Sequence, residues 1–252
     1  MSRPIISVQN ISFRYPDGKK ALENVSFEVY QGESVALIGP NGAGKSTLLL
    51  HLNGSMGIPD DKRAKIKIDE IDLTSNNLKE IRKNVGIVFQ NPDDQLFMPS
   101  VFDDVAFGPI NLGYPDNLIR EKVTKSLEAV GLANFEKRTS YHLSYGEKKL
   151  VSIATIISMD PKLVVLDEPT NGLDPRGKKK IMHILKNMTI TKVIATHDLE
   201  MAYELCDRAI LINEGKIIAI GNVSDIIENE QLMLENGLET PKSIILSRKV
   251  KQ

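Results

Sequence analysis

The chain has 252 residues, a formal net charge of −1 and a single cysteine. This length is enough for one or two domains with a sizeable core, and a charge so close to neutral gives no electrostatic footprint for nucleic acid. One cysteine excludes an internal disulfide and suits a reducing compartment. The sequence has no apolar run of roughly 18 residues that would predict a membrane-spanning helix, and its start lacks the apolar core of a signal peptide. We therefore expect a cytoplasmic protein without a nucleic-acid partner, in which any membrane role requires another subunit.

The N-terminal part of the chain alternates apolar and polar residues, as half-buried strands do. Residues 5–13 and 21–30 are predicted strands, and Pro16-Asp17-Gly18 forms a turn between them. We expect a small antiparallel layer here. Tyr15 closes the first strand, and two interpretations stay open: an ordinary aromatic residue of a turn, or a flat ring on which a base stacks.

A glycine-rich loop follows the apolar strand predicted at 34–38 and precedes a helix predicted at 45–52. Its sequence fits the template G-x-x-x-x-G-K-[ST], in which glycines let the backbone N–H groups surround an anion and the helix adds the positive end of its dipole. Lys45 would bring charge to the β- and γ-phosphates, and the Ser46 hydroxyl can ligate Mg²⁺. The stretch predicts a nucleoside triphosphate site rather than a simple turn. Its contacts would be Gly39, Asn41, Gly42, Gly44, Lys45, Ser46 and Thr47.

The middle of the chain changes from short strands to helices. After a loop at 54–62 come the expected elements, which are strands at 64–69 and 70–73, a short helix at 78–83 and a buried strand at 85–89. Gln90 ends that strand and could reach a metal-bound water or simply cap the strand. Three helices follow from Ser100, the second burying Leu118, Val123, Leu127 and Val130 and the third starting at Ser144. Residues 91–159 are therefore predicted to be a helical insertion between strands of the core.

Two carboxylates follow four apolar residues at 163–166. A continuous apolar run suits a parallel strand covered on both faces, and ligands bind at the carboxyl ends of such strands. Adjacent strand residues point to opposite sides, so Asp167 and Glu168 would have different tasks. One could hold Mg²⁺ through water, and the other could orient or deprotonate an attacking water. The alternative is that Asp-Glu-Pro is only a common way to leave a strand.

The C-terminal third continues the alternation of helix and strand. The expected elements are a turn at 171–175, a helix at 176–188, a strand at 192–196, a helix at 199–206 and a hairpin of 208–212 with 216–220. His197 follows a core strand as Gln90 and Asp167 do, which favours a chemical role over packing. Residues from 223 onward are mixed helical and polar.

These motifs together resemble the ATP-binding cassette (ABC) family over nearly the whole chain. The decisive stretch is Leu143-Ser144-Tyr145-Gly146-Glu147, which is similar to the family signature Leu-Ser-Gly-Gly-Gln and lies at the start of a predicted helix. Tyr145 replaces a glycine and Glu147 a glutamine, whereas Ser144 and Gly146, which the resemblance places at the γ-phosphate, are retained. The replacements add a ring and a negative charge near the opposing nucleotide, and both bear on the strength of ATP-driven closure.

The resemblance implies an α/β P-loop NTPase fold with a mixed RecA-like core sheet, an N-terminal antiparallel β layer and an inserted α-helical signature subdomain. It implies an ATPase domain at 1–225 and a C-terminal extension at 226–252, with ATP and Mg²⁺ as cofactors. The implied catalytic residues are Glu168, His197 and the Q-loop glutamine Gln90. The implied Mg²⁺ ligands are Ser46, Gln90 and Asp167. The implied nucleotide contacts are Tyr15, the phosphate loop, Ser144 and Gly146, with Asp174 as the D-loop aspartate.

A narrower resemblance points to the ATPases of energy-coupling-factor importers, which include the cobalt and nickel uptake systems. It is carried by residues 90–97, by 101–109 and by Glu147-Lys148-Lys149. In that group the short helix after the Q-loop helps to form a groove, here at about 90–109, that receives integral membrane subunits. The resemblance implies a peripheral protein at the cytoplasmic face of the membrane.

One chain would hold only half of each ATP site, because the signature helix would belong to the helical insertion and the phosphate loop to the core. We therefore expect a homodimer, or a heterodimer with a second ABC ATPase, in which ATP lies between the phosphate loop of one copy and Ser144 of the other. Other ATPases fit less well. A chromosome or repair ATPase would carry a long coiled coil, a translation-associated protein usually has two cassettes, and a small-molecule kinase would lack Ser144-Tyr145-Gly146.

Overall fold

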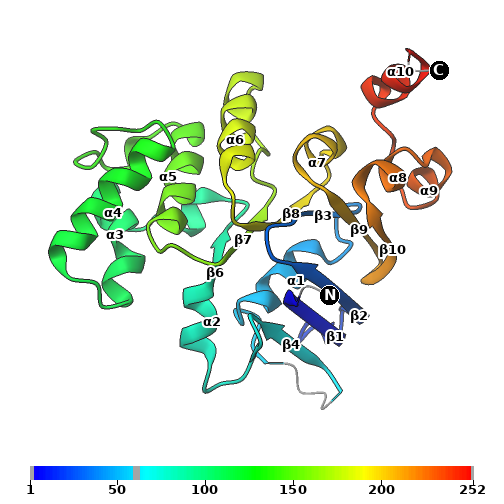
Figure 1. The fold of residues 1–252 in the computed structure, drawn as a ribbon, viewed down its shortest axis with the longest axis horizontal. Helices are drawn as coiled ribbons and strands as arrows, with labels where there is room; N and C mark the ends of the chain where they lie inside the picture. The colour runs from blue at the N-terminus through cyan, green and yellow to red at the C-terminus, as the bar shows by residue number, and fades with distance from the viewer. Residues whose placement is uncertain (1–2, 59–62, 251–252) are drawn as a thin grey trace. The chain divides into compact units, whose positions relative to one another are not determined.

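The computed structural model describes residues 3–58 and 63–250, drawn in Figure 1. It contains two compact units, one formed by Met1–Arg82 with Ile190–Gln252 and the other by Lys83–Thr189. The end of the loop predicted at 54–62 lies outside the described residues. Within the described ranges, no helix has the length and apolar character needed to cross a membrane.

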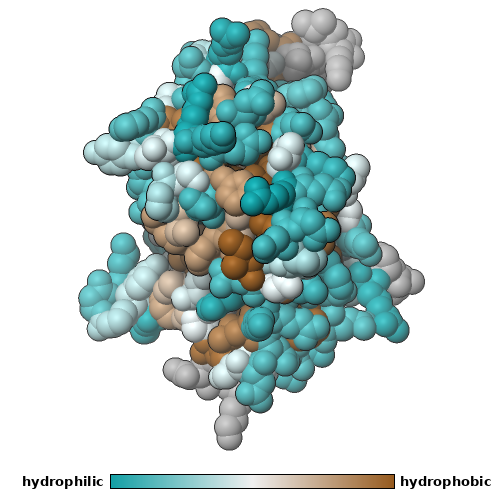
Figure 2. Space-filling view, turned by 90° about the vertical axis from the view of Figure 1, so that its left-hand side faces the viewer, coloured by the Kyte–Doolittle hydropathy of each residue, from teal (hydrophilic) through white to brown (hydrophobic). Residues whose placement is uncertain are grey.

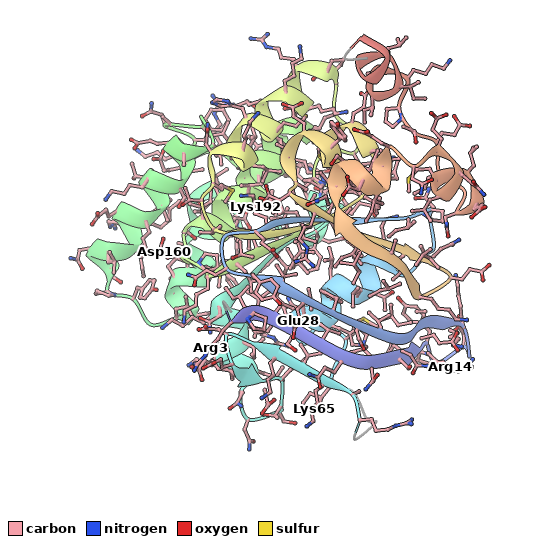
Figure 3. The ribbon with its side chains drawn as sticks, turned by 45° about the vertical axis from the view of Figure 1, so that its right-hand side comes forward. Arg3, Arg14, Glu28, Lys65, Asp160 and Lys192 are labelled. Carbon is pink, nitrogen blue, oxygen red and sulfur yellow. The ribbon has the colours of Figure 1, made fainter. Side chains whose placement is uncertain are left out.

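The first unit contains an antiparallel sheet in the order β2-β1-β4-β5. The strands are β1 (Pro4–Arg14), β2 (Lys20–Tyr30), β4 (Lys65–Ile68) and β5 (Ile71–Asp72). Alternation along β2 buries every second side chain over most of its length, which is why the sequence reads as a half-buried strand. Figure 3 shows charged side chains around this sheet, among them Arg14, Glu28 and Lys65. The antiparallel layer predicted from the sequence is confirmed.

The same unit contains three parallel strands with an antiparallel neighbour. β3 (Ser34–Ile38) lies between β8 (Thr191–Thr196) and β9 (Arg208–Asn213), and β10 (Lys216–Asn222) pairs antiparallel with β9. All residues of β3 and β8 are buried, as their continuous apolar character predicts. The sheet is therefore mixed, and its parallel strands end next to the start of α1 (Lys45–Leu52) and of α7 (Leu199–Leu205).

Three short helices form the end of the chain. They are α8 (Val223–Ile227), α9 (Glu230–Glu235) and α10 (Lys242–Val250). α8 packs against β9, β10 and α7 and buries Val223 and Ile227. The mixed helical character predicted from residue 223 onward is found.

The second unit combines two parallel strands with a group of helices. β6 (Val85–Val88), which follows α2 (Leu78–Asn84), pairs parallel with β7 (Leu163–Asp167). The helices are α3 (Val101–Asn111), α4 (Asp116–Ala129), α5 (Tyr145–Ile157) and α6 (Pro175–Asn187), with short 3₁₀ helices η1 (Pro92–Asp94) and η2 (Ser140–His142). α3, α4 and α5 pack on one another and form the green group of Figure 1.

The buried face of α4 differs by one residue from the face predicted. Val123, Leu127 and Val130 are buried as expected, but Leu118 is only half-buried and Ile119 is buried in its place. Ile119 lies four residues before Val123, so it continues the i, i+4 spacing of the buried stripe, whereas Leu118 lies five residues before it. The choice between two adjacent apolar residues was wrong by one position.

Candidate functional site

The phosphate loop adopts a backbone that requires glycine at two places. A Cβ on Gly39 would lie 2.1 Å from the carbonyl oxygen of Ile212, and a Cβ on Gly44 would lie 2.5 Å from that of Ala21. Gly44 also has φ 106 and precedes α1 directly. Gly42 has φ 80, and a Cβ there would meet nothing within 4 Å. The loop is therefore packed tightly against its own unit at both ends and open in the middle, where an anion would be held.

The donors of this loop fit a polyphosphate. In the described part of the chain no side chain caps the start of α1, so its first N–H groups can face an anion. Lys45 is buried, and its ammonium donates to the carbonyl oxygens of Gly39 at 2.7 Å and Pro40 at 3.0 Å. The side chains of Asn41 and Ser46 are exposed, which leaves the Ser46 hydroxyl accessible to a cation. The residues present fit a nucleoside triphosphate with a divalent metal.

Tyr15 lies beside the phosphate loop. Its hydroxyl shares a hydrogen bond of 2.7 Å with the hydroxyl of Thr47, and its ring meets Phe13 edge-on at 5.2 Å. The backbone oxygen of Thr47 is also 2.7 Å from Nδ1 of His51. The structure thus brings together two residues predicted to contact one nucleotide, although stacking of a base on Tyr15 stays a prediction.

The two carboxylates at the end of β7 have different backbones. Asp167 is the last residue of the strand, and Glu168 lies beyond it with φ 44. Both side chains are nearly buried. The prediction that they alternate as strand neighbours was wrong, because Glu168 sits in a left-handed turn where the two-residue period no longer applies.

Gln90 comes two residues after β6, with its side chain exposed. Its carbonyl oxygen accepts a hydrogen bond of 2.5 Å from the Lys149 ammonium and one of 3.4 Å from the Tyr145 hydroxyl. Lys149 also donates to the carbonyl oxygen of Glu168 at 3.2 Å. The second unit therefore connects two of the predicted catalytic residues through one side chain of α5.

The signature stretch begins α5 with a capping box. The Ser144 side chain accepts from the Glu147 backbone N–H, and the Glu147 carboxylate accepts from the N–H of Ser144 at 2.8 Å and from its hydroxyl at 2.7 Å. Hydrogen bonds from the Ser144 side chain and backbone hold the pKa of Glu147 below its usual value. Ser144 is exposed, and Gly146 follows it in the first turn. The spacing Ser-x-x-Glu, here Ser144 to Glu147, is the sequence signal for this box.

The remaining predicted residues lie at element ends. His197 follows β8 with its side chain exposed, in the same unit as the phosphate loop. Asp174 caps α6 by accepting from the Gly177 N–H at 2.7 Å. The sequence analysis named Lys149 only within the resemblance to energy-coupling-factor ATPases and gave it no role of its own. The available signal was its place on the apolar face of α5, four residues before Ile153.

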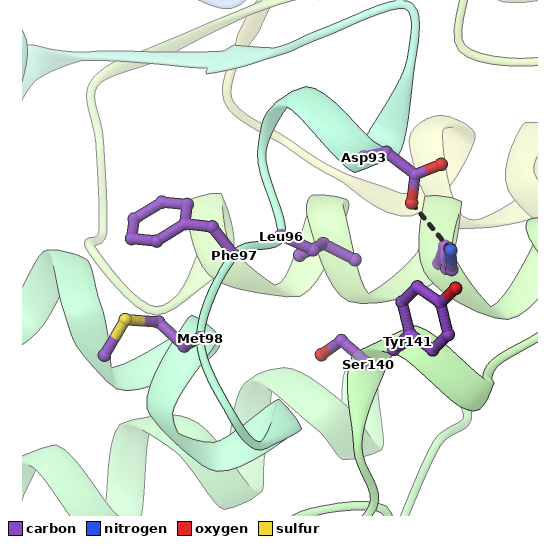
Figure 4. Close-up of a pocket in the computed structure, with 7 residues that line it drawn as sticks. Asp93, Leu96, Phe97, Met98, Ser140 and Tyr141 are labelled. Carbon is purple, nitrogen blue, oxygen red and sulfur yellow. Dashed lines mark hydrogen bonds and ion pairs between the residues drawn. The ribbon is translucent and has the colours of Figure 1, made fainter.

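A pocket lies on the second unit where η1, η2 and α5 meet (Figure 4). Its volume is about 140 Å³, and its lining consists of Asp93, Leu96, Phe97, Met98, Ser140, Tyr141 and Lys148. Lys148 and Asp93 form an ion pair of 2.6 Å across it. Phe97 is 63% exposed and Tyr141 82%, and Phe97 meets the exposed Phe107 edge-on at 5.1 Å. Figure 2 shows apolar residues gathered in the middle of the face turned toward the viewer.

Comparison with known proteins agrees with this geometry. The family model described as ABC transporter matches residues 22–171. A protein of Geobacter sulfurreducens, named as an ABC transporter ATP-binding protein, is 48% identical over 97% of both chains. The energy-coupling factor transporter ATP-binding protein EcfA of Methanothermobacter thermautotrophicus is 45% identical over 98% of this chain and 80% of its own length.

Solved structures give the same result. CbiO1 of Clostridium perfringens, described as part of the ABC transporter complex CbiONQ, superimposes with a TM-score of 0.80 and 35% identity over 97% of this chain and 99% of that one. A dimeric ATP-binding cassette bound to ADP and phosphate in a post-hydrolysis state matches with a TM-score of 0.76 and 27% identity, over 86% of this chain and 98% of that one. The chain therefore belongs to the ABC transporter family, as an ATP-hydrolysing ATP-binding subunit that resembles those of the energy-coupling-factor type.

Proposed function

We propose that this chain powers a membrane importer of the energy-coupling-factor type by closing and opening with a second ATPase subunit. The observation that carries the proposal is the exposed Ser144 at the N-terminus of α5. A serine directed to solvent at a helix start can bind a phosphate that another subunit supplies. Two copies, or this chain and a related ATPase, would each hold one ATP between a phosphate loop and the partner's signature helix.

Each site residue then has a task. Lys45 and the backbone of residues 39–47 bind the phosphates, and Tyr15 stacks on the base. Glu168 orients and deprotonates the attacking water, assisted by His197. Ser144 and Gly146 contact the γ-phosphate of the nucleotide held by the other subunit.

Three polar side chains, one at the start of α1 and two at or after strand ends, suit a magnesium ion. Ser46, Gln90 and Asp167 are the residues that would hold it, since hydroxyl, amide and carboxylate oxygens are the ligands this ion prefers. Mg²⁺ supplies neutralisation of the charge on the phosphates when it is bound. This assignment is supported by the exposed Ser46 hydroxyl and the buried Asp167 carboxylate.

The membrane subunits would dock on the segment at about 90–109, next to the pocket that Asp93 and Lys148 span. Exposed aromatic side chains there, chiefly Phe97, and the neighbouring Tyr141 give the apolar contact area that a helix from a membrane protein needs. The protein would then be peripheral at the cytoplasmic face of the membrane. Nucleic acid is not a partner in this proposal, since the net charge is −1.

The cargo that the resemblance favours is cobalt or nickel. Support comes from the motif at residues 90–97, which is similar to that of cobalt and nickel uptake ATPases. We assign residues 1–225 to the ATPase domain, with the helical insertion at 91–159, and residues 226–252 to a C-terminal extension. Uptake of radiolabelled cobalt or nickel by cells that express this chain with its membrane subunits tests the cargo. Uptake of a vitamin but of neither metal would overturn it.

The test of the ATPase cycle is the size of a Glu168→Gln variant with and without ATP and Mg²⁺. This variant should bind ATP but hydrolyse it slowly, so ATP should convert it from monomer to dimer. Lys45→Ala in the same background is the control and should remain monomeric, because it loses the phosphate contact. A Glu168→Gln protein that stays monomeric at all ATP concentrations, with and without membrane subunits, would refute the closing step.

Docking is tested by exchanging one exposed aromatic residue. Phe97→Ser should abolish copurification with coexpressed membrane subunits while ATP hydrolysis by the isolated protein is kept. Ile218, which is 44% exposed in the other unit, provides the matched control, and Ile218→Ser should copurify normally. Equal copurification of both variants would contradict the assigned docking surface.

A further inference from the structure

A lysine is completely buried in the helical unit. In the described part of the chain, Lys149 is the bulkiest of the fully buried side chains. Burying an ammonium group is expensive unless hydrogen bonds and opposite charges compensate for lost water. Burial lowers the pKa of Lys149 to about 8, and the carboxylates of Asp167 and Glu168 oppose this shift. Such a group needs a specific set of partners to be retained.

Those partners are backbone carbonyls at the ends of two neighbouring strands. The Lys149 ammonium lies 2.5 Å from the oxygen of Gln90, past the end of β6, and 3.2 Å from the oxygen of Glu168, past the end of β7. An ammonium carries three donors, so one side chain can satisfy both carbonyls at once. The ring of Tyr145, one turn earlier on α5, lies 5.9 Å from the same nitrogen.

Both carbonyls belong to segments that leave a strand, Gln90 after β6 and Glu168 after β7. Glu168 has φ 44, a conformation that costs a non-glycine residue energy unless its surroundings impose it. Its oxygen accepts from Lys149 and from the Asn171 N–H at 3.2 Å, and both hydrogen bonds support the turn. The oxygen of Gln90 accepts from Lys149 and, more weakly, from the Tyr145 hydroxyl at 3.4 Å.

We propose that Lys149 is a positioning residue for ATP hydrolysis, because its ammonium ties the backbone of Gln90 to that of Glu168 and makes α5 the common support of both. The inference rests on the proposed roles of Glu168 and Gln90. Lys149 would act through these two backbone carbonyls rather than on the substrate. It links the signature helix to the catalytic turn, so a shift of α5 on closing moves the Glu168 backbone directly.

The test compares Lys149→Met and Lys149→Arg by steady-state ATP hydrolysis and by fluorescent-nucleotide binding. Lys149→Met keeps the length and apolar stem but has no donor, so we expect kcat to fall at least tenfold. The KM for ATP and the Kd for the nucleotide should stay within about twofold, because Tyr15 and residues 39–47 are unchanged. Lys149→Arg keeps charge and donors and should have a kcat at least threefold above that of Lys149→Met.

Lys125→Met provides the matched control. Lys125 lies on α4 of the same unit, its side chain is 71% exposed, and its ion pair is with Glu121 one turn away. Removing this charge should leave both kcat and KM unchanged. If Lys149→Met does not fold, Lys149→Gln carries the same comparison, since its amide can bond locally but is too short to reach both carbonyls.

Any of three results would overturn the assignment. The first is a kcat for Lys149→Met within twofold of wild type, and the second is a nucleotide Kd that rises in proportion to the fall in kcat. The third is a kcat for Lys149→Arg no higher than that for Lys149→Met. Failure of the proposed function would give a different experimental result. In that case the wild-type protein would show no hydrolysis that Glu168→Gln abolishes, whatever the Lys149 variants do.

Discussion

Asp104 offers a quantitative test of how the helical unit is held together. Its side chain is 3% exposed, and one carboxylate oxygen accepts from the N–H groups of Phe97 and Met98 at 3.0 and 2.9 Å. The other oxygen accepts from the buried hydroxyl of Ser140 at 2.5 Å. One carboxylate therefore joins α3 to the segment after η1 and to η2, which are the two sides of the pocket in Figure 4.

The cost of Asp104→Ala follows from these three bonds. Hydrogen bonds to a charged group contribute about 1.5–3 kcal/mol each, and an orphaned buried donor loses its full hydration. Water can reach the two partly exposed N–H groups but not the Ser140 hydroxyl, so we expect a net loss of about 3 kcal/mol of unfolding free energy. For a chain of this size that lowers the melting temperature by roughly 6–12 °C. Asp104→Asn keeps an oxygen for the two N–H groups and offers its amide to Ser140, so it should lose only about 1 kcal/mol.

Calorimetry of the wild type and both variants measures these losses, and amide hydrogen exchange locates them. The amides of Phe97 and Met98 should lose protection in Asp104→Ala and keep it in Asp104→Asn. The reasoning fails if Asp104→Ala unfolds within about 1 kcal/mol of wild type, or if the asparagine variant is as unstable as the alanine variant. Either result would mean that the carboxylate is not what holds the two sides of the pocket.

Three further outcomes are expected. Glu147→Gln keeps an acceptor for Ser144 but removes a negative charge beside the γ-phosphate site. In a Glu168→Gln background, the dissociation constant of the ATP-bound dimer, measured by sedimentation, should therefore fall at least threefold. An unchanged dissociation constant would show that the charge does not oppose closure. Burial raises the pKa of the Cys206 thiol to about 12. At pH 8, mass spectrometry should therefore find the native protein unmodified by iodoacetamide and the urea-unfolded protein fully alkylated. Equal alkylation rates for native and unfolded protein would contradict this. Burial lowers the pKa of His51 below its ordinary value of 6.5. As the pH falls, His51 therefore takes up its proton in the unfolded chain before it does so in the folded protein. The contribution of His51 to stability is complete above pH 6.5 and is lost as the pH falls from there through the folded pKa. The urea midpoint should therefore decrease between pH 7 and 5 in wild type and decrease less in His51→Gln, and parallel curves would rule the histidine out.

Local sequence patterns predicted most of the strands and helices because each has a period that depends on near neighbours. The buried runs of β3, β7 and β8 and the capped start of α5 were identifiable from consecutive residues. Errors arose where two residues competed for one position. In α4 the buried stripe contains Ile119 rather than Leu118, because this is the side of the helix that packs against α3 and α5. Division into domains at 1–225 and 226–252 stays a prediction.

The phosphate loop and the signature stretch can be recognised from consecutive residues, because in each the chemistry comes from residues a few positions apart in one turn of backbone. Glycines, lysine and helix start at 39–47 act together without help from distant parts of the chain. The three-dimensional fold was needed to show that Lys149 reaches carbonyls 59 and 19 residues away, and that Glu168 leaves the strand in a left-handed turn. No local pattern encodes such contacts, since they exist only after β6, β7 and α5 have packed and removed the ammonium from water.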